Sequence, residues 1–225
     1  MVTYQEYSSA LIDKFVKASD PHRAKQMQAY MKDNFTFFGI STPLRKEIMR
    51  SLSPPKPLLL NYDFIKTIDL LWESDERELQ YCALELMQKV LKQFNVDHLD
   101  WIESLITRKS WWDSVDSIAP NIVGHIFKQE SKEKSLFLEK WIASDNFWLN
   151  RTAIIFQLKY HTNTDEDILI ASILAHDQSK EFFVRKAQGW ALRQYSKTNP
   201  VFVRQFIEAN PQLSGLTKRE AMKYC

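Results

Sequence analysis

Boundaries between helical patterns recur along this chain at nearly constant spacing, and this recurrence constrains its fold more than any other feature. With Ser74, Ser110, Ser144 and His176 as markers, the intervals are 36, 34 and 32 residues. Two helices of about 12 to 17 residues, with their turns, fill such an interval. The spacing therefore predicts successive antiparallel helix pairs, each of which buries its apolar face against its neighbours.

The composition favours the same fold class. Only 4 of the 225 residues are Gly while 26% are charged, which favours helices over many tight β-turns, and no alternating strand pattern is present. The apolar fraction of 44% suffices for one well-buried core. We predict an all-α fold of stacked, HEAT-like antiparallel helix pairs, a single domain over residues 1–225 that forms a curved array with a basic concave face.

Three local signals divide the first part of the chain. Asp20 followed by Pro21 predicts an N-cap and the first residue of a helix. Gly39 lies in an apolar turn and is expected in a left-handed conformation. Residues 53–57 contain three prolines and are expected to form a loop.

The charge is distributed unevenly although its net value is only +2. Residues 1–59 have 9 Lys or Arg against 5 Asp or Glu, residues 176–225 have 9 against 4, and residues 60–103 are acidic with 4 against 10. Basic ends that flank an acidic middle suit a protein with one face for an anionic partner.

Cysteine and histidine usage argues against several classes of protein. Cys82 and Cys225 are too few for a disulfide framework or a metal motif, and the five His are scattered without ligand spacing. The N-terminus has no basic segment followed by an apolar run, and no apolar run approaches membrane-spanning length. We expect a soluble, cytoplasmic protein without a metal site.

Residues 109–120, with the sequence KSWWDSVDSIAP, combine aromatic and acidic side chains in a pattern that indicates a functional site. Ser110 is expected to cap a helix that runs from Trp111 to Phe127. Trp112 and Asp116 are one helical turn apart, so an aromatic ring and a carboxylate would share one spot where the core meets solvent. The alternative is structural: both Trp side chains belong to the core, and the helix dipole stabilises the Asp.

The same helix is expected to have an apolar stripe and a kink. Pro120 removes a backbone donor and should bend the helix at that point. The stripe that faces the core is formed by Trp111, Val115, Ile118, Ile122 and Ile126.

Arg151 lies among apolar residues on the face of a second helix, expected over residues 146–160. A guanidinium keeps its proton, so in apolar surroundings it requires an anion or a route to water. The functional interpretation is an Arg offered to a phosphate at the floor of a pocket. A snorkelling or Asp-paired structural Arg is the alternative.

Trp190 lies off the apolar stripe of a third helix, expected over residues 180–196. It shares its face with Lys186 and Arg193, which suits stacking on a nucleic-acid sugar or base while the cations bind the flanking phosphates. Contact with a neighbouring repeat is the alternative interpretation.

At these positions the sequence resembles the AlkD-type DNA alkylation repair glycosylases, a family built from HEAT-like repeats. The resemblance extends over nearly the whole chain. The segments on which it rests are YMKDNFTFFGI (30–40), KSWWDSVDSI (109–118), KWIASDNFWLNR (140–151), IFQLKY (155–160), SKEFFVRKAQGWALRQYSKTNP (179–200) and LTKREA (216–221).

The resemblance implies a monofunctional DNA glycosylase of base excision repair that hydrolyses the N-glycosidic bond of cationic alkylpurines in duplex DNA, such as N3-alkyladenine and N7-alkylguanine. It implies no metal and no organic cofactor, and a lesion that stays stacked in the duplex. The family's functional aspartate falls on Asp116, its two lesion-cradling tryptophans on Trp112 and Trp190, and its arginine on Arg151.

Two positions near the N-terminus are also implied as DNA contacts. The family's tyrosine falls on Tyr30, and a neighbouring polar position, glutamine in the best-known member, is Ser41 here. This departure puts in doubt any N-terminal contact carried over from that glutamine. We expect a monomer, because a DNA grip of this type needs no symmetry. The alternatives are a HEAT-like clamp that binds DNA without catalysis and a protein-interaction scaffold.

Overall fold

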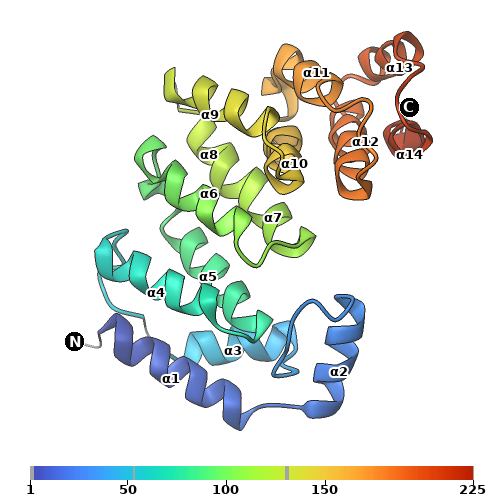
Figure 1. The fold of residues 1–225 in the computed structure, drawn as a ribbon. Helices are drawn as coiled ribbons and strands as arrows, with labels where there is room; N and C mark the ends of the chain where they lie inside the picture. The colour runs from blue at the N-terminus through green and yellow to red at the C-terminus, as the bar shows by residue number, and fades with distance from the viewer. Residues whose placement is uncertain (1–2, 53, 130–131, 225) are drawn as a thin grey trace. The chain divides into compact units, whose positions relative to one another are not determined.

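The computed structural model describes residues 3–52, 54–129 and 132–224, and within them the chain is helical with no strand (Figure 1). The predicted all-α fold is therefore confirmed. None of the helices in this described part combines the length and apolar content that crossing a membrane requires.

The contacts within the chain divide it into two compact units, Met1–Gln93 and Phe94–Cys225. The single domain over residues 1–225, the curved array and its basic concave face stay predictions.

Within residues 3–52 and 54–93, which the structure describes, the first unit contains five α-helices (Figure 1). They are α1 Tyr4–Lys17, α2 Pro21–Tyr30, α3 Thr42–Ser51, α4 Tyr62–Glu73 and α5 Arg77–Lys89, followed by a short 3-10 helix Leu91–Gln93. Asp20 caps α2 as predicted, because its carboxylate accepts from the N–H groups of His22 and Arg23. Residues 54–57 form a loop as predicted, and Ser53 lies outside the described residues.

The turn between α2 and α3 is held by a carboxylate from α5. Gly39 has φ of +86°, as predicted, and a Cβ there would lie 2.1 Å from the Asp20 carbonyl oxygen. The Glu78 carboxylate accepts from the N–H groups of Phe38, Gly39 and Ile40 at 3.1, 2.9 and 3.0 Å. A fully buried acid thus orders a turn that has few backbone bonds of its own.

The second unit contains the remaining α-helices of the described residues (Figure 1). They are α6 Leu99–Thr107, α7 Trp112–Ile118, α8 Gly124–Phe127, α9 Lys132–Ile142, α10 Phe147–Ile155, α11 Glu166–Leu174, α12 Phe182–Ser196, α13 Pro200–Ala209 and α14 Gly215–Ala221. Short 3-10 helices lie before, between and after them, at Val96–His98, Phe156–Lys159, His161–Asn163 and Met222–Tyr224.

The four repeat markers lie in corresponding turns. Ser74 follows α4, Ser110 lies between α6 and α7, Ser144 follows α9, and His176 follows α11. Each marker therefore separates the two helices of one pair, as the spacing predicts.

Three of these turns are closed by a buried amide from the second helix of the pair. The Gln80 amide donates to the carbonyls of Leu71, Trp72 and Ser74, the Asn150 amide to those of Trp141, Ile142 and Ser144, and the Gln188 amide to those of Ile173 and His176. Carbonyls at a helix C-terminus have no partner within the helix, so one side chain satisfies several of them at once.

The predicted helix from Trp111 to Phe127 is present but differs in two details. Ser110 as N-cap is wrong: Trp111 is the N-cap, and the Ser110 hydroxyl donates to the Ile106 carbonyl at 2.7 Å. That carbonyl belongs to the last turn of α6 and needs a partner. Between α7 and α8, residues Ala119–Val123 form a π-helical segment around Pro120, where the sequence predicts a kink.

The predicted apolar stripe of this helix faces the core for most of its length. Val115, Ile118, Ile122 and Ile126 are fully buried, whereas Trp111 is only partly buried because it lies at the N-cap in extended backbone.

Candidate functional site

A cavity of about 360 Å³ in the second unit brings together side chains from three helices. Its volume falls within the range of about 300 to 1,000 Å³ that small-molecule sites occupy. The lining residues are Trp112, Asp116, Arg151, Phe182, Phe183, Lys186, Trp190 and Arg193. All four residues predicted as catalytic are among them, together with two predicted DNA-binding residues.

These side chains converge because they occupy equivalent places in successive helix pairs. Asp116, Arg151 and Lys186 are each the fifth residue of their helix, α7, α10 and α12, and they follow one another at intervals of 35 residues. Aromatic residues begin the three helices at the same interval: Trp112, Phe147 and Phe182, each one turn before the charged residue of its helix. Side chains four residues apart project side by side, so α7 and α12 each offer an aromatic ring beside a charged group.

The carboxylate of Asp116 is held by the guanidinium of Arg151. Nε of Arg151 donates to Oδ1 at 2.7 Å and Nη2 donates to Oδ2 at 2.8 Å. Nη1 of Arg151 donates to the Phe183 carbonyl oxygen at 2.5 Å. The Arg151 side chain is 3% exposed and that of Asp116 is 18% exposed, so the guanidinium is the floor of the cavity and the carboxylate is open to it. The arrangement is the Asp-paired Arg that the sequence left as an alternative.

The protonation of Asp116 reflects two opposing effects. Burial raises the pKa of its carboxyl above the ordinary value, Arg151 opposes this shift through its hydrogen bonds and charge, and Asp113 adds to it. Burial has the largest effect. An acid with a raised pKa beside a cavity is a candidate functional group.

The two predicted tryptophans line the cavity and are both partly buried. The ring centre of Trp190 is 6.0 Å from Cζ of Arg151, and its side chain also packs against the apolar core around α10 to α13. The structural and functional interpretations of Trp190 are therefore compatible. In the wall of the cavity, the ring of Phe183 contacts the rings of Trp111 and Trp148, with centroid distances of 5.1 and 4.9 Å, and this packing fixes the position of the wall.

A family model described as DNA alkylation repair enzyme matches residues 11–225. The chain belongs to the DNA alkylation repair enzyme family. A solved structure described as a predicted DNA alkylation repair enzyme from Enterococcus faecalis is 32% identical, with a TM-score of 0.82 over 92% of this chain and 96% of that one. No curated protein matches. The family resemblance is confirmed, and membership of a DNA alkylation repair family indicates DNA as the partner.

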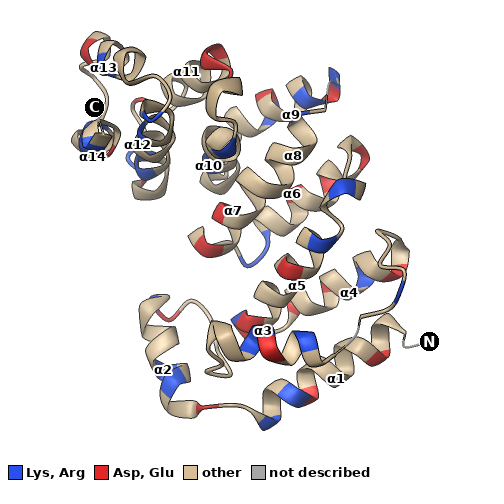
Figure 2. Ribbon diagram, turned by 180° about the vertical axis from the view of Figure 1, so that it is seen from behind, with Lys and Arg blue, Asp and Glu red and all other residues tan. Residues whose placement is uncertain are grey.

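In this family member the predicted DNA-binding cations share a carboxylate that the sequence did not single out. Lys186 Nζ and Arg193 Nη1 each lie 2.8 Å from a carboxylate oxygen of Glu220, on α14. Lys and Arg segments lie along α12 and α14 (Figure 2). Glu220 lies 34 residues after Lys186, and the packing of α14 on α12 brings its carboxylate to both cations.

The two remaining predicted contacts lie in the first unit, outside the residues that line the cavity. Tyr30 is the last residue of α2 and its side chain is 69% exposed. Ser41 is the N-cap of α3, and its hydroxyl makes no capping hydrogen bond. Contacts of Tyr30 and Ser41 with DNA stay predictions.

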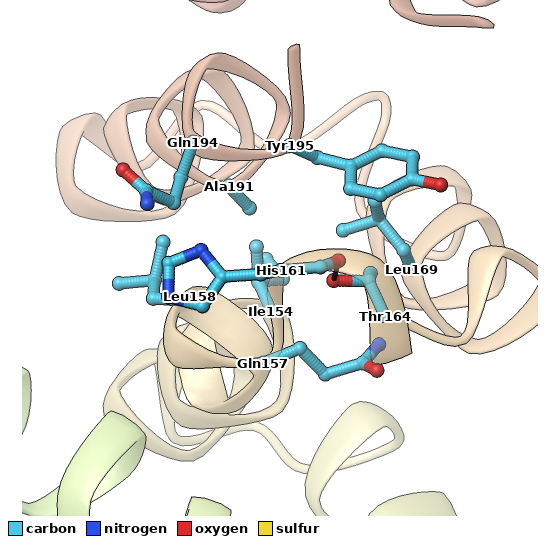
Figure 3. Close-up of a pocket in the computed structure, with 9 residues that line it drawn as sticks. All are labelled: Ile154, Gln157, Leu158, His161, Thr164, Leu169, Ala191, Gln194 and Tyr195. Carbon is cyan, nitrogen blue, oxygen red and sulfur yellow. Dashed lines mark hydrogen bonds between the residues drawn. The ribbon is translucent and has the colours of Figure 1, made fainter. Parts of the chain in front are cut away.

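A second cavity, beside α10 and α12, is too small for a substrate. Its volume of about 10 Å³ is comparable to one water molecule. Figure 3 shows its lining, formed by Ile154, Gln157, Leu158, His161, Thr164, Leu169, Ala191, Gln194 and Tyr195. Within the described ranges, no group of three or more His, Cys, Asp or Glu is placed to hold a metal ion.

Proposed function

We propose that this member of the DNA alkylation repair family is a monofunctional DNA glycosylase that releases cationic alkylpurines from duplex DNA. The observation that supports this most is the Asp116 carboxylate, which opens into a cavity that two indole rings line. Lys186 and Arg193 add positive charge at the same cavity, which suits a phosphodiester backbone.

The reaction requires stabilisation of positive charge on the sugar. An N7- or N3-alkylated purine already has a positive charge, so it departs as a neutral base when the bond from C1′ to nitrogen breaks. The deoxyribose becomes oxocarbenium-like, and a fixed carboxylate lowers the energy of that state. Water then adds to C1′ and loses one proton, either to Asp116 or to solvent, which leaves an abasic site.

Arg151 prepares the carboxylate for this role. Its bidentate hydrogen bonds fix both oxygens of Asp116 before the DNA arrives, so little reorganisation is needed when charge develops. We assign Trp112 and Trp190 to the sugar and the backbone of the lesion, where their ring faces attract positive charge. This mode of contact is compatible with a lesion that stays stacked, because no base has to enter a closed pocket.

The direct test is incubation of the protein with duplex DNA that contains a single N7-methylguanine, followed by strand cleavage at abasic sites. We expect base release that exceeds spontaneous depurination and follows protein concentration. Specific DNA binding without release from several cationic lesions would favour the alternative, a non-catalytic clamp. Binding that is insensitive to salt would favour a protein-interaction scaffold, since phosphate contacts weaken steeply with ionic strength.

The pH dependence of release should reflect the raised pKa of Asp116. The reaction needs the ionised carboxylate, so the rate should fall as pH drops through a value above about 3.9, the ordinary pKa of Asp. Single-turnover rates across the acidic range, corrected for spontaneous depurination, measure this limb. A rate that stays constant down to the ordinary pKa of Asp would contradict the assignment of Asp116.

Trp190→Ala should weaken engagement of the lesion. Removal of one aromatic side chain that stacks on nucleic acid lowers the binding free energy by about 1 to 3 kcal/mol, which corresponds to a decrease in kcat/KM of roughly 5- to 150-fold. Trp190→Phe, which keeps an aromatic face, is the matched control and should retain most of the activity. Unchanged kinetics for the Ala variant would return Trp190 to a purely structural role.

A further inference from the structure

Glu220 is a buried carboxylate at which three cations meet. Lys186, Arg193 and Lys223 each place a nitrogen 2.8 Å from one of its oxygens. The Glu220 side chain is 8% exposed, and its cationic neighbours lower the pKa of its carboxyl to about 2. It is therefore ionised under all physiological conditions, and the group of four side chains has a net positive charge.

The backbone that holds Glu220 is fixed against α12. Gly189 faces it, and a Cβ at that position would lie 2.4 Å from Cβ of Glu220, so the two helices are in direct contact. Thr217, one turn earlier on α14, donates from its hydroxyl to the Gln188 side-chain oxygen at 2.9 Å. Gln188 in turn closes the turn after α11 through its amide. The carboxylate thus sits on a rigid support.

Two of the three cations line the cavity and the third does not. Lys186 and Arg193 are lining residues, whereas Lys223 lies outside that set. Long cationic side chains lose considerable rotamer freedom when they bind an anion. Glu220 restricts the side chains of Lys186 and Arg193 before DNA binds, and it contacts one nitrogen of each. Because an ammonium has three N–H donors and a guanidinium has five, donors remain for a phosphate.

We propose that Glu220 is a positioning residue that aims Lys186 and Arg193 at the DNA backbone beside the lesion. The inference rests on the proposed function of the cavity and deepens it. Glu220 itself need not contact DNA, and its negative charge alone would repel a phosphate. Glu220 contributes by preorganisation. Two cations that are already held in position bind one phosphodiester more selectively than two mobile cations do.

Glu220→Gln distinguishes positioning of the cations from a simple effect of charge, because loss of the charge should strengthen DNA binding whereas loss of positioning should weaken the recognition of the lesion. If Glu220 acts only through its charge, its removal raises the net positive charge and tightens binding to every duplex. If it positions the cations, the variant loses discrimination. We expect its affinity for undamaged duplex to be equal to or higher than that of the wild type. We expect its preference for duplex with a tetrahydrofuran abasic-site analogue, and its single-turnover release of N7-methylguanine, to fall by about 10- to 100-fold.

A mutant cycle identifies the route of the effect. In a Lys186→Met, Arg193→Met background, Glu220→Gln should produce no further loss, because the cations through which it acts are gone. Lys223→Met is the matched control, since it removes a partner of Glu220 that does not line the cavity, and it should leave release unchanged. Glu220→Asp should recover part of the preference, and thermal unfolding of each variant identifies losses caused by misfolding.

The outcomes are distinct. Wild-type discrimination and release in Glu220→Gln, or a further loss in the background without the two cations, would overturn the proposal. A wild type that releases no base would contradict the proposed glycosylase. In that case the binding measurement would still test the role of Glu220. The positioning role would be overturned if the wild type showed no preference for duplex with the abasic-site analogue, or if Glu220→Gln kept that preference.

Discussion

Asp116→Asn is expected to lower the single-turnover rate of base release by about 100- to 1,000-fold, the size of effect seen when one fixed electrostatic stabiliser is removed. Asn occupies nearly the same volume and keeps one oxygen that can accept from Arg151, but it lacks the charge that stabilises an oxocarbenium-like sugar. Binding to duplex DNA should persist, since Lys186, Arg193 and both tryptophans remain.

The matched control is Asp113→Asn, which removes the same charge from the same helix. Asp113 does not line the cavity, although its charge raises the pKa of Asp116. Its variant should release base at nearly the wild-type rate. Since the Asn at position 116 leaves a buried guanidinium without a full counter-charge, thermal unfolding should be measured and the assays run well below the transition. Equal rates for Asp116→Asn and the wild type would remove Asp116 from the mechanism.

Arg151→Met is expected to have the largest effect on stability, a loss of about 3 to 5 kcal/mol in the free energy of unfolding. The guanidinium is almost fully buried and connects Asp116 to the backbone of α12 through the Phe183 carbonyl. Its removal leaves a partly buried carboxylate without its cation. The pKa of Asp116 should then rise further, so base release at neutral pH should fall as well.

Chemical denaturation of the wild type and three variants measures this loss of stability. Arg204→Met, at an exposed position on α13, is the control and should change stability by no more than about 0.5 kcal/mol. Adding Asp116→Leu to Arg151→Met should recover much of the stability, because no unpaired charge remains, yet it should not recover activity. A stable and active Arg151→Met protein would show that the ion pair has neither role.

The helix pairs could be predicted from the sequence because their signals are local. Ser74 and Ser144 lie in the predicted turns, Asp20 caps its helix, and Gly39 adopts the left-handed conformation. The prediction of Ser110 as an N-cap is wrong because a hydroxyl between two helix ends can bond to either end, and here it donates to the Ile106 carbonyl of α6.

The candidate site could be predicted only in part. The placement of Trp112 beside Asp116 follows from helical periodicity, but the pairing of Asp116 with Arg151 depends on the packing of α7 against α10. The 35-residue interval between Asp116, Arg151 and Lys186 is a signal in the sequence that could have grouped these three residues. Glu220 follows Lys186 by 34 residues, close to the same interval, but its contact with both Lys186 and Arg193 depends on the packing of α12 against α14.

The π-helical segment Ala119–Val123 has a consequence for the orientation of the acid. One residue of a regular helix corresponds to a rotation of about 100°, and a wider turn absorbs part of that rotation without breaking the helix. The segment therefore sets the rotation about the helix axis between Asp116 and the buried residues Ile122 and Ile126. Deletion of one residue there would turn Asp116, together with Trp112 on the same helix, away from Arg151 and Trp190 while the buried residues downstream stayed in the core.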